Sequence, residues 1–152
     1  MITLRGITIA ALLAVTTTAV AATPAPAGVR VEHAWIRWLP ANLPAAGYAT
    51  IVNDGDATLR LTGATSADYQ MVMLHHSRLA SGDSTMEKVD GLDIPAHASV
   101  KLAPGGYHLM LSHATHPIKP GDKVAITLEF TDGATLQTDF SVLPSNSAGP
   151  AD

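Results

Sequence analysis

The sequence predicts an all-β fold, a β-sandwich or small barrel of Greek-key type. From Val29 onward, short runs of alternating and β-branched residues are separated by Gly, Pro and Asp turn signals. No segment shows a long 3.6-residue period, and a length of 152 residues suits one domain. Because 47% of the residues are hydrophobic but only 5% are aromatic, we expect a mainly aliphatic core.

The first three strands are expected at residues 29–35, 47–53 and 59–65. Residues 29–35 alternate polar and apolar side chains, as a strand with one buried face does. A loop bracketed by prolines follows at 40–44, and Asp54-Gly55-Asp56 ends the second strand with residues that favour turns.

The fourth and fifth strands are expected at 70–79 and 86–89, on either side of a turn at Ser81-Gly82-Asp83. Since turn residues separate these two runs closely, we expect them to pair as a hairpin. Over residues 64–74 the pattern alone leaves strand and helix both open.

Four further strands complete the predicted domain, at 99–102, 107–111, 124–130 and 135–142. Strong turn signals separate them, beginning with Pro104-Gly105-Gly106. The last two strands flank Asp132-Gly133, which is typical of a β-hairpin.

The first 21 residues have the pattern of a cleavable secretory signal peptide. Arg5 precedes an apolar run at 7–15, and Ala19-Val20-Ala21 provides small residues for cleavage. We therefore expect a periplasmic protein with no membrane span after cleavage. The remaining chain is predicted to comprise a flexible leader, a β-domain and a disordered tail that lacks large apolar residues, at 22–28, 29–143 and 144–152.

Composition excludes several classes of function. The net charge is −4 without any run of basic residues, which argues against a nucleic-acid partner. The chain contains no cysteine, so it has no disulfide, no thiolate ligand and no cysteine for lipid attachment. Neither G-x-S-x-G nor H-E-x-x-H occurs, and we predict that the protein is not an enzyme.

Histidine and methionine gather in the middle of the chain. His108 and Met110 occupy positions i and i+2 of a predicted strand, so their side chains share one face. His75 and Met86 lie on the two arms of the predicted hairpin. If those arms lie near the strand with His108, four neutral ligands converge.

Two imidazoles and two thioethers form a soft, uncharged ligand set. Thioether sulfur favours Cu(I), whereas Zn(II) recruits thiolates, carboxylates or more histidine, and Ca(II) and Mg(II) prefer oxygen. A blue-copper electron carrier is excluded because its metal needs a cysteine ligand. The ligand types therefore predict a Cu(I) site that can still yield its ion to a thiolate-rich acceptor.

The spacing His75-x10-Met86-x21-His108-x-Met110 resembles, without a gap, the motif of the PCuAC family of periplasmic Cu(I) chaperones. The stretches PGGYHLML at 104–111 and IKPGDKVAITLEF at 118–130 are also similar to that family. The resemblance covers essentially the whole chain after the predicted signal peptide.

This resemblance implies a cupredoxin-like β-barrel that holds one Cu(I) on His75, Met86, His108 and Met110. It also implies delivery of copper to the CuA centre of cytochrome c oxidase subunit II, or to another thiol-containing acceptor. Some relatives carry a His- and Met-rich tail that binds Cu(II), but the tail of this chain contains neither residue.

Additional histidines and methionines leave alternatives open. Met71 and Met73 share strand parity with His75, so they either line the site or pack in the core. Three further histidines form either a weaker secondary site for Cu(II) or a set of solvated side chains: His76, His113 and His116.

Two other functions remain open from the sequence. A periplasmic protein for copper buffering or resistance would share the site but lack a dedicated acceptor. A non-metal Ig-like interaction module would make the His and Met spacing a coincidence.

Overall fold

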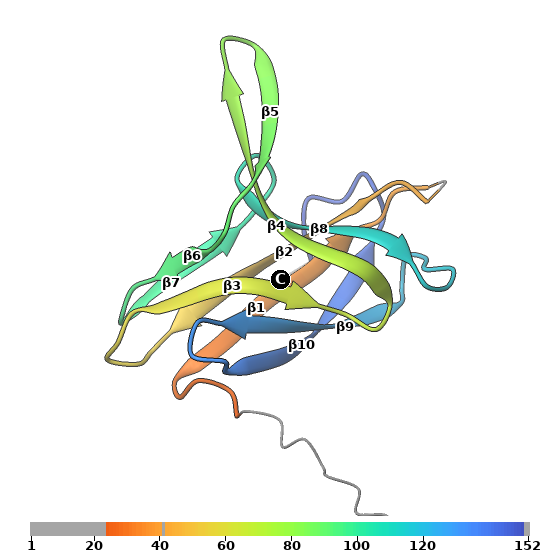
Figure 1. Cartoon of the computed structure of the whole chain (residues 1–152). Helices are drawn as coiled ribbons and strands as arrows, with labels where there is room; N and C mark the ends of the chain where they lie inside the picture. Colours follow the sequence, from red (N-terminus) through yellow and green to blue (C-terminus); the bar gives the residue numbers. More distant parts are fainter. Residues whose placement is uncertain (1–23, 41, 151–152) are drawn as a thin grey trace, which may run out of the picture.

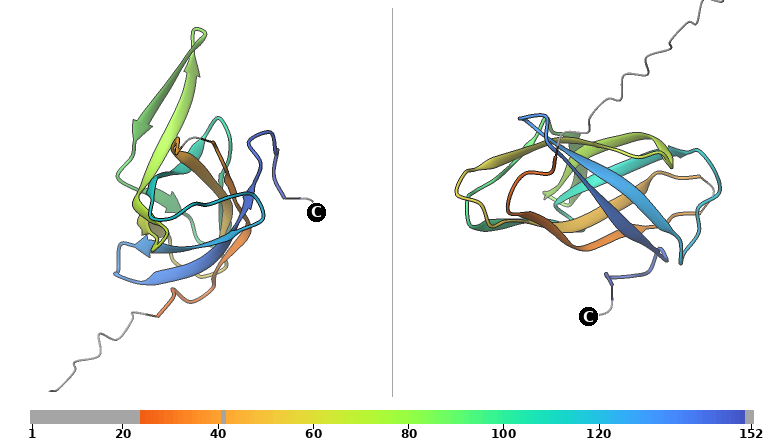
Figure 2. Two further views of the ribbon diagram at one scale, coloured as in Figure 1. Left: turned by 90° about the vertical axis from the view of Figure 1, so that its right-hand side faces the viewer. Right: turned by 90° about the horizontal axis from the view of Figure 1, so that it is seen from below.

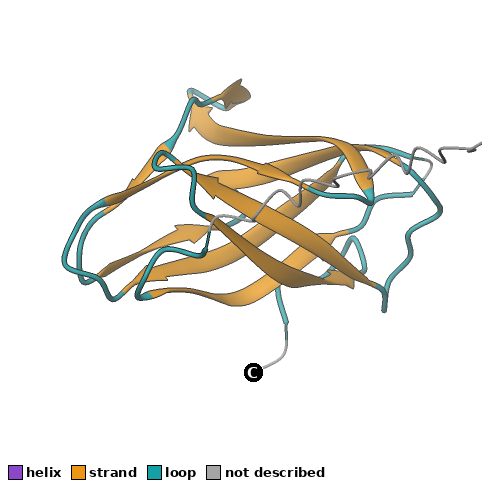
Figure 3. Cartoon of the chain, turned by 60° about the horizontal axis from the view of Figure 1, so that its bottom comes forward, coloured by secondary structure: helices purple, strands orange, loops and turns teal. Residues whose placement is uncertain are grey.

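The computed structural model describes residues 24–40 and 42–150, and its regular elements are all strands (Figure 3). The predicted all-β fold class is confirmed. The predicted signal peptide at 1–21 lies outside the described residues. The strands are β1 (Val29–Arg37), β2 (Ala45–Asn53), β3 (Leu59–Thr65), β4 (Tyr69–Ala80), β5 (Asp83–Lys88), β6 (Leu92–Ile94), β7 (Ala98–Leu102), β8 (Tyr107–Ala114), β9 (Lys123–Phe130) and β10 (Thr135–Leu143).

The strands form one continuous sheet that curls into a barrel (Figures 1 and 2). Its order is β5-β4-β8-β2-β1-β10-β9-β3-β6, with β7 paired to the second half of β2. The β1–β10 pair is parallel, and the other pairs are antiparallel. Contacts of β3 with β4 and of β6 with β7 bring distant parts of this path together, so the sheet encloses a core.

Alternation along the strands separates the core from the outer face. In β9, Val124, Ile126, Leu128 and Phe130 are buried, while the residues between them are partly exposed. Aliphatic side chains dominate the largest fully buried groups, together with Phe140. The core is therefore mainly aliphatic, as the composition predicted.

The structure resolves the alternative left open at 64–74 and shifts several predicted strand boundaries. Residues 64–74 are not helical, because β3 ends at Thr65 and β4 begins at Tyr69. Strand β5 begins at Asp83 rather than at residue 86. Strand β6 was not predicted, since three residues before a proline are too short to show a pattern.

The segments flanking the strands are partly described. Residues 144–150 follow β10 and include a turn in which the Ser147 N–H donates to the Pro144 carbonyl at 3.0 Å. Disorder of the tail at 144–152 stays a prediction. Within the described ranges, we find no helix with the length and apolar character needed to cross a bilayer.

Candidate metal centre

A projecting hairpin, β4–β5, carries two of the predicted ligands (Figure 1). Its loop is only Ser81 and Gly82, because Ala80 pairs directly with Asp83. Both loop residues have positive φ, 54° and 88°, which is the geometry of a type I′ turn. Since the hairpin extends beyond the barrel, Met86 on β5 is 57% exposed.

Strand register places the four predicted ligands on one face. His75 of β4 pairs with His108 of β8, and Ser77 of β4 pairs with Met86 of β5. Paired residues point to the same face, and residues two apart on one strand do so as well. His75, Met86, His108 and Met110 therefore project from the same side of β5-β4-β8.

A tight turn fixes the orientation of His108. Pro104 and Gly105 occupy the central positions of the turn, Gly105 has φ 80°, and the Gly106 N–H donates to the Ala103 carbonyl at 3.0 Å. The Gly106 carbonyl then accepts from His108 Nδ1 at 3.2 Å. Because a carbonyl only accepts, the proton lies on Nδ1 and the Nε2 lone pair is left for a metal.

His75 is also prepared to act as a neutral ligand. Its ring lies edge-on to that of His108, with centroids 5.8 Å apart. Burial lowers the pKa of His75, and the nearby His108 and Lys88 lower it further. Its Nδ1 is buried without a hydrogen-bond partner, so this nitrogen fits a role as a metal ligand.

A pocket of about 400 Å³ opens between the hairpin and the barrel. Its lining includes Met86, His108 and Met110. His75 does not line it but contacts the ring of His108, which does. Within residues 24–40 and 42–150, no carboxylate lines this pocket. Among the described residues there is no group of three or more His, Asp or Glu side chains that could hold a metal ion.

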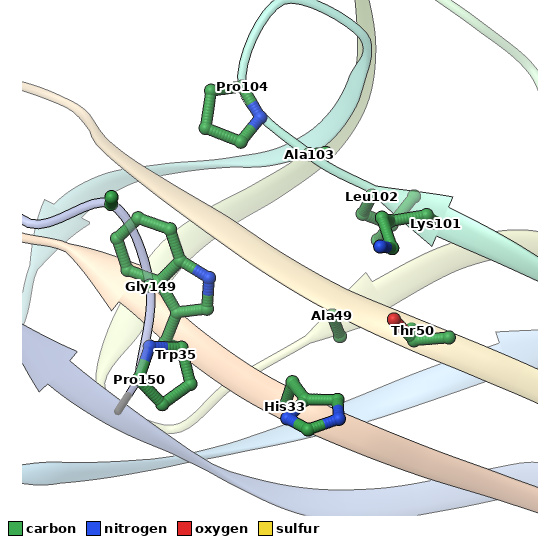
Figure 4. Close-up of a pocket in the computed structure, with 11 residues that line it drawn as sticks. His33, Trp35, Ala49, Thr50, Lys101, Leu102, Ala103, Pro104, Gly149 and Pro150 are labelled. Atoms are coloured by element: carbon green, nitrogen blue, oxygen red, sulfur yellow. The ribbon is translucent and has the colours of Figure 1, made fainter. Parts of the chain in front are cut away.

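The sequence alone did not assign Arg37 and Tyr48 to this pocket, although both line it. They come from β1 and β2; β1 pairs with β2, and β2 pairs with the ligand strand β8, a pairing that local sequence does not reveal. Trp35 packs against Tyr48 with ring centroids 4.8 Å apart. On its other side Trp35 lines a second pocket of about 380 Å³, beside Gly149 (Figure 4).

The three histidines considered for a secondary Cu(II) site are not brought together. His76 stacks on Tyr107 with centroids 4.2 Å apart, on the face opposite His75. Tyr107 and His113 are six residues apart on β8, a separation of roughly 20 Å. His116 instead bonds Asp68 at 2.9 Å through its Nε2.

The extra methionines lie outside the pocket lining. Met73 pairs with Met110 across β4 and β8 but lines a different cavity, next to Lys88. Met71 pairs with Ser112 and is 44% exposed. Neither methionine is part of the buried core, so packing there does not account for them.

Comparison with known proteins places the chain in a family. Residues 29–142 match the model described as “Putative lipoprotein LpqE-like”. The chain belongs to the LpqE-like family, which is the PCuAC family. A relative named “Putative lipoprotein Lxx21020”, from Leifsonia xyli subsp. xyli, is 36% identical over 160 residues and is aligned over 96% of both chains.

Solved PCuAC structures share the fold. The copper-bound PCuAC domain from PmoF2 is 28% identical, with a TM-score of 0.64 over 77% of this chain and 93% of that domain. The solution structure of Cu(I)-DR1885 from Deinococcus radiodurans is 31% identical, with a TM-score of 0.64 over 83% of this chain and 84% of that one. Both relatives were solved with copper.

Proposed function

We propose that this PCuAC protein binds one Cu(I) ion through His75, Met86, His108 and Met110. The observation that carries the proposal is the convergence of two neutral imidazoles and two thioethers on one face of β5-β4-β8. These donors match the preference of Cu(I) for soft, uncharged ligands. The copper-bound PmoF2 domain and Cu(I)-DR1885 support the choice of metal.

The proposed role is that of an exported chaperone, not of an enzyme. The signal-peptide pattern of residues 1–21 supports export to the periplasm. The open pocket, the exposed Met86 and the lack of any thiolate favour a site that releases its ion. We propose the CuA centre of cytochrome c oxidase as the acceptor, as the family resemblance implies.

A Cu(I) competition titration against a chromophoric chelator tests the site. The exported protein should bind one tight equivalent, and a Met86→Leu/Met110→Leu double variant should lose it, since leucine keeps the volume but removes the sulfur. Met71→Leu is the matched control and should bind like the parent. Equal affinity of the double variant and the parent would exclude these two methionines as ligands.

Copper transfer separates a chaperone from a buffering protein. On mixing with an apo CuA domain, a chaperone should pass its copper to that domain, which spectroscopy of the CuA centre reports. Retention of copper in the presence of every thiolate-rich acceptor would favour buffering or resistance while leaving the site intact. An Ig-like module would show no tight Cu(I) binding at all.

A further inference from the structure

Arg37 is a cation on the same face as the proposed ligands. It ends β1 and pairs with Ala46 of β2, which in turn pairs with Met110 of β8. Two strand spacings separate Arg37 from Met110, or roughly 10 Å between backbones. The side chains of Arg37 and Met110 line the same pocket.

The guanidinium of Arg37 is held in place by two aromatic rings. Its central carbon lies 5.5 Å from the ring centroid of Trp35 and 5.3 Å from that of Tyr48. Both rings are buried, and a guanidinium over a ring face is attracted to it. The charge is therefore fixed beside the pocket rather than free to move into solvent.

This charge has no counter-ion within the described part of the chain. The ion pairs of residues 24–40 and 42–150 do not include Arg37. Its Nε is buried without a hydrogen-bond partner, and no Asp or Glu of the described residues lines the pocket. Burying part of an unpaired guanidinium destabilises the folded state, so we expect a function that explains its position.

We propose that Arg37 makes the pocket select Cu(I) over Cu(II) and weakens its hold on Cu(I). The inference rests on the proposed copper site. Because all four proposed ligands are neutral, the full charge of the ion faces the guanidinium. The Coulomb penalty scales with ion charge, so it acts twice as strongly on Cu(II) as on Cu(I).

The size of the effect follows from the separation. For two unit charges roughly 10 Å apart in a partly buried site, the repulsion corresponds to on the order of a tenfold change in affinity. Arg37 would thus lower the affinity for Cu(I) about tenfold and that for Cu(II) about a hundredfold. Both effects suit a carrier that keeps its copper reduced and gives it away.

Lys88 provides a matched control for charge. It pairs with His75 and lies near enough to lower the pKa of that ring, yet it is exposed on the rim of the hairpin. Solvent screens an exposed charge far more than a half-buried one. Removing the Lys88 charge should therefore change copper selectivity much less than removing the Arg37 charge.

The test measures Cu(I) and Cu(II) affinities of the exported protein by chelator competition. Arg37→Gln and Arg37→Met should bind Cu(I) about tenfold and Cu(II) about a hundredfold more tightly than the parent. Arg37→Lys should keep the ratio of the two affinities near that of the parent. Lys88→Gln should change either affinity by less than about threefold.

Two results would overturn the inference. One is an unchanged ratio of Cu(I) to Cu(II) affinity in both neutral variants. The other is an Arg37→Lys variant whose affinities match those of the neutral variants, because side-chain shape rather than charge would then set the selectivity. Having two neutral variants protects against a folding defect in one of them, which circular dichroism detects. Failure of the parent to bind Cu(I) would instead remove the proposed site and this inference with it.

Discussion

At the scale of single residues, His108 shows how the backbone prepares a ligand. The Gly106 carbonyl accepts from both Ser77 N–H at 3.0 Å and His108 Nδ1 at 3.2 Å. The carbonyl is thereby fixed between β4 and β8, and it selects one imidazole tautomer. A hydrogen bond to the nitrogen that does not bind the metal orients the ring and raises its basicity as a ligand.

We therefore predict that His108 carries its proton on Nδ1 in the copper-free protein at neutral pH. Long-range proton–nitrogen NMR correlations distinguish the two ring nitrogens and report which one is protonated. After Cu(I) addition, the Nε2 resonance should shift the most. A copper-free protein with the proton on Nε2 would contradict the assigned hydrogen bond.

The exposure of methionine side chains predicts the order of their oxidation. Met86 is 57% exposed and Met71 44%, whereas Met110 is half-buried. Peroxide should therefore oxidise Met86 and Met71 before Met110. Because a sulfoxide presents a hard oxygen in place of a soft sulfur, Cu(I) affinity should fall as Met86 is converted.

Mass spectrometry combined with chelator competition follows both steps. In a Met71→Leu/Met73→Leu background, Met86 and Met110 are the only methionines left after residue 21, so a change in affinity reports on them. Unchanged Cu(I) binding after verified oxidation of Met86 and Met110 would show that neither sulfur holds the ion.

At the scale of elements, one surface ion pair joins two loops near the end of β8. His116 Nε2 lies 2.9 Å from Asp68 Oδ1, and its Nδ1 donates to the Pro117 carbonyl at 3.2 Å. The Asp68 backbone also accepts from Thr115 N–H at 2.9 Å. The hydrogen bond to Asp68 is the main cause of a raised pKa at His116.

A raised pKa gives this contact a definite pH dependence. The folded state binds the proton more tightly than the unfolded chain, so the stabilisation is complete below the ordinary histidine value of 6.5 and is lost as pH rises through the raised pKa. We expect the difference in unfolding free energy between the parent and Asp68→Asn to be larger at pH 5.5 than at pH 8.5.

Urea denaturation at the two pH values measures this difference, and an NMR titration measures the pKa of His116 directly. In Asp68→Asn that pKa should move down towards 6.5. An identical titration of His116 in both proteins would exclude the ion pair as the cause of its raised pKa.

At the scale of the whole molecule, local sequence patterns predicted where the strands lie better than they predicted which strands pair. The parity of His108 and Met110 was correct because alternation is a property of one strand. The pairing of β2 with β8 was not predictable, since it joins segments far apart in the chain and thereby brings β1 near the ligand strand. Arg37 was missed for that reason, while the three-residue β6 was too short to detect.

The two faces of β8 serve different purposes in the barrel. Leu109 and Leu111 are fully buried and pack in the core, while His108 and Met110 lie on the opposite face of the strand. Stability and copper binding should therefore respond to different substitutions within three consecutive residues. We predict that Leu109→Ala lowers the free energy of unfolding by about 2–5 kcal/mol through loss of apolar contacts and a residual cavity.

Because the strand pairs of β8 hold the ligands in register, the folded fraction of Leu109→Ala should keep Cu(I) affinity close to that of the parent. Denaturant unfolding and chelator competition at low temperature measure the two properties separately. Leu128→Ala on β9 is the matched control, since it opens a similar cavity away from the ligand strands. Loss of Cu(I) affinity in folded Leu109→Ala but not in Leu128→Ala would show that core packing beneath β8 sets the ligand geometry.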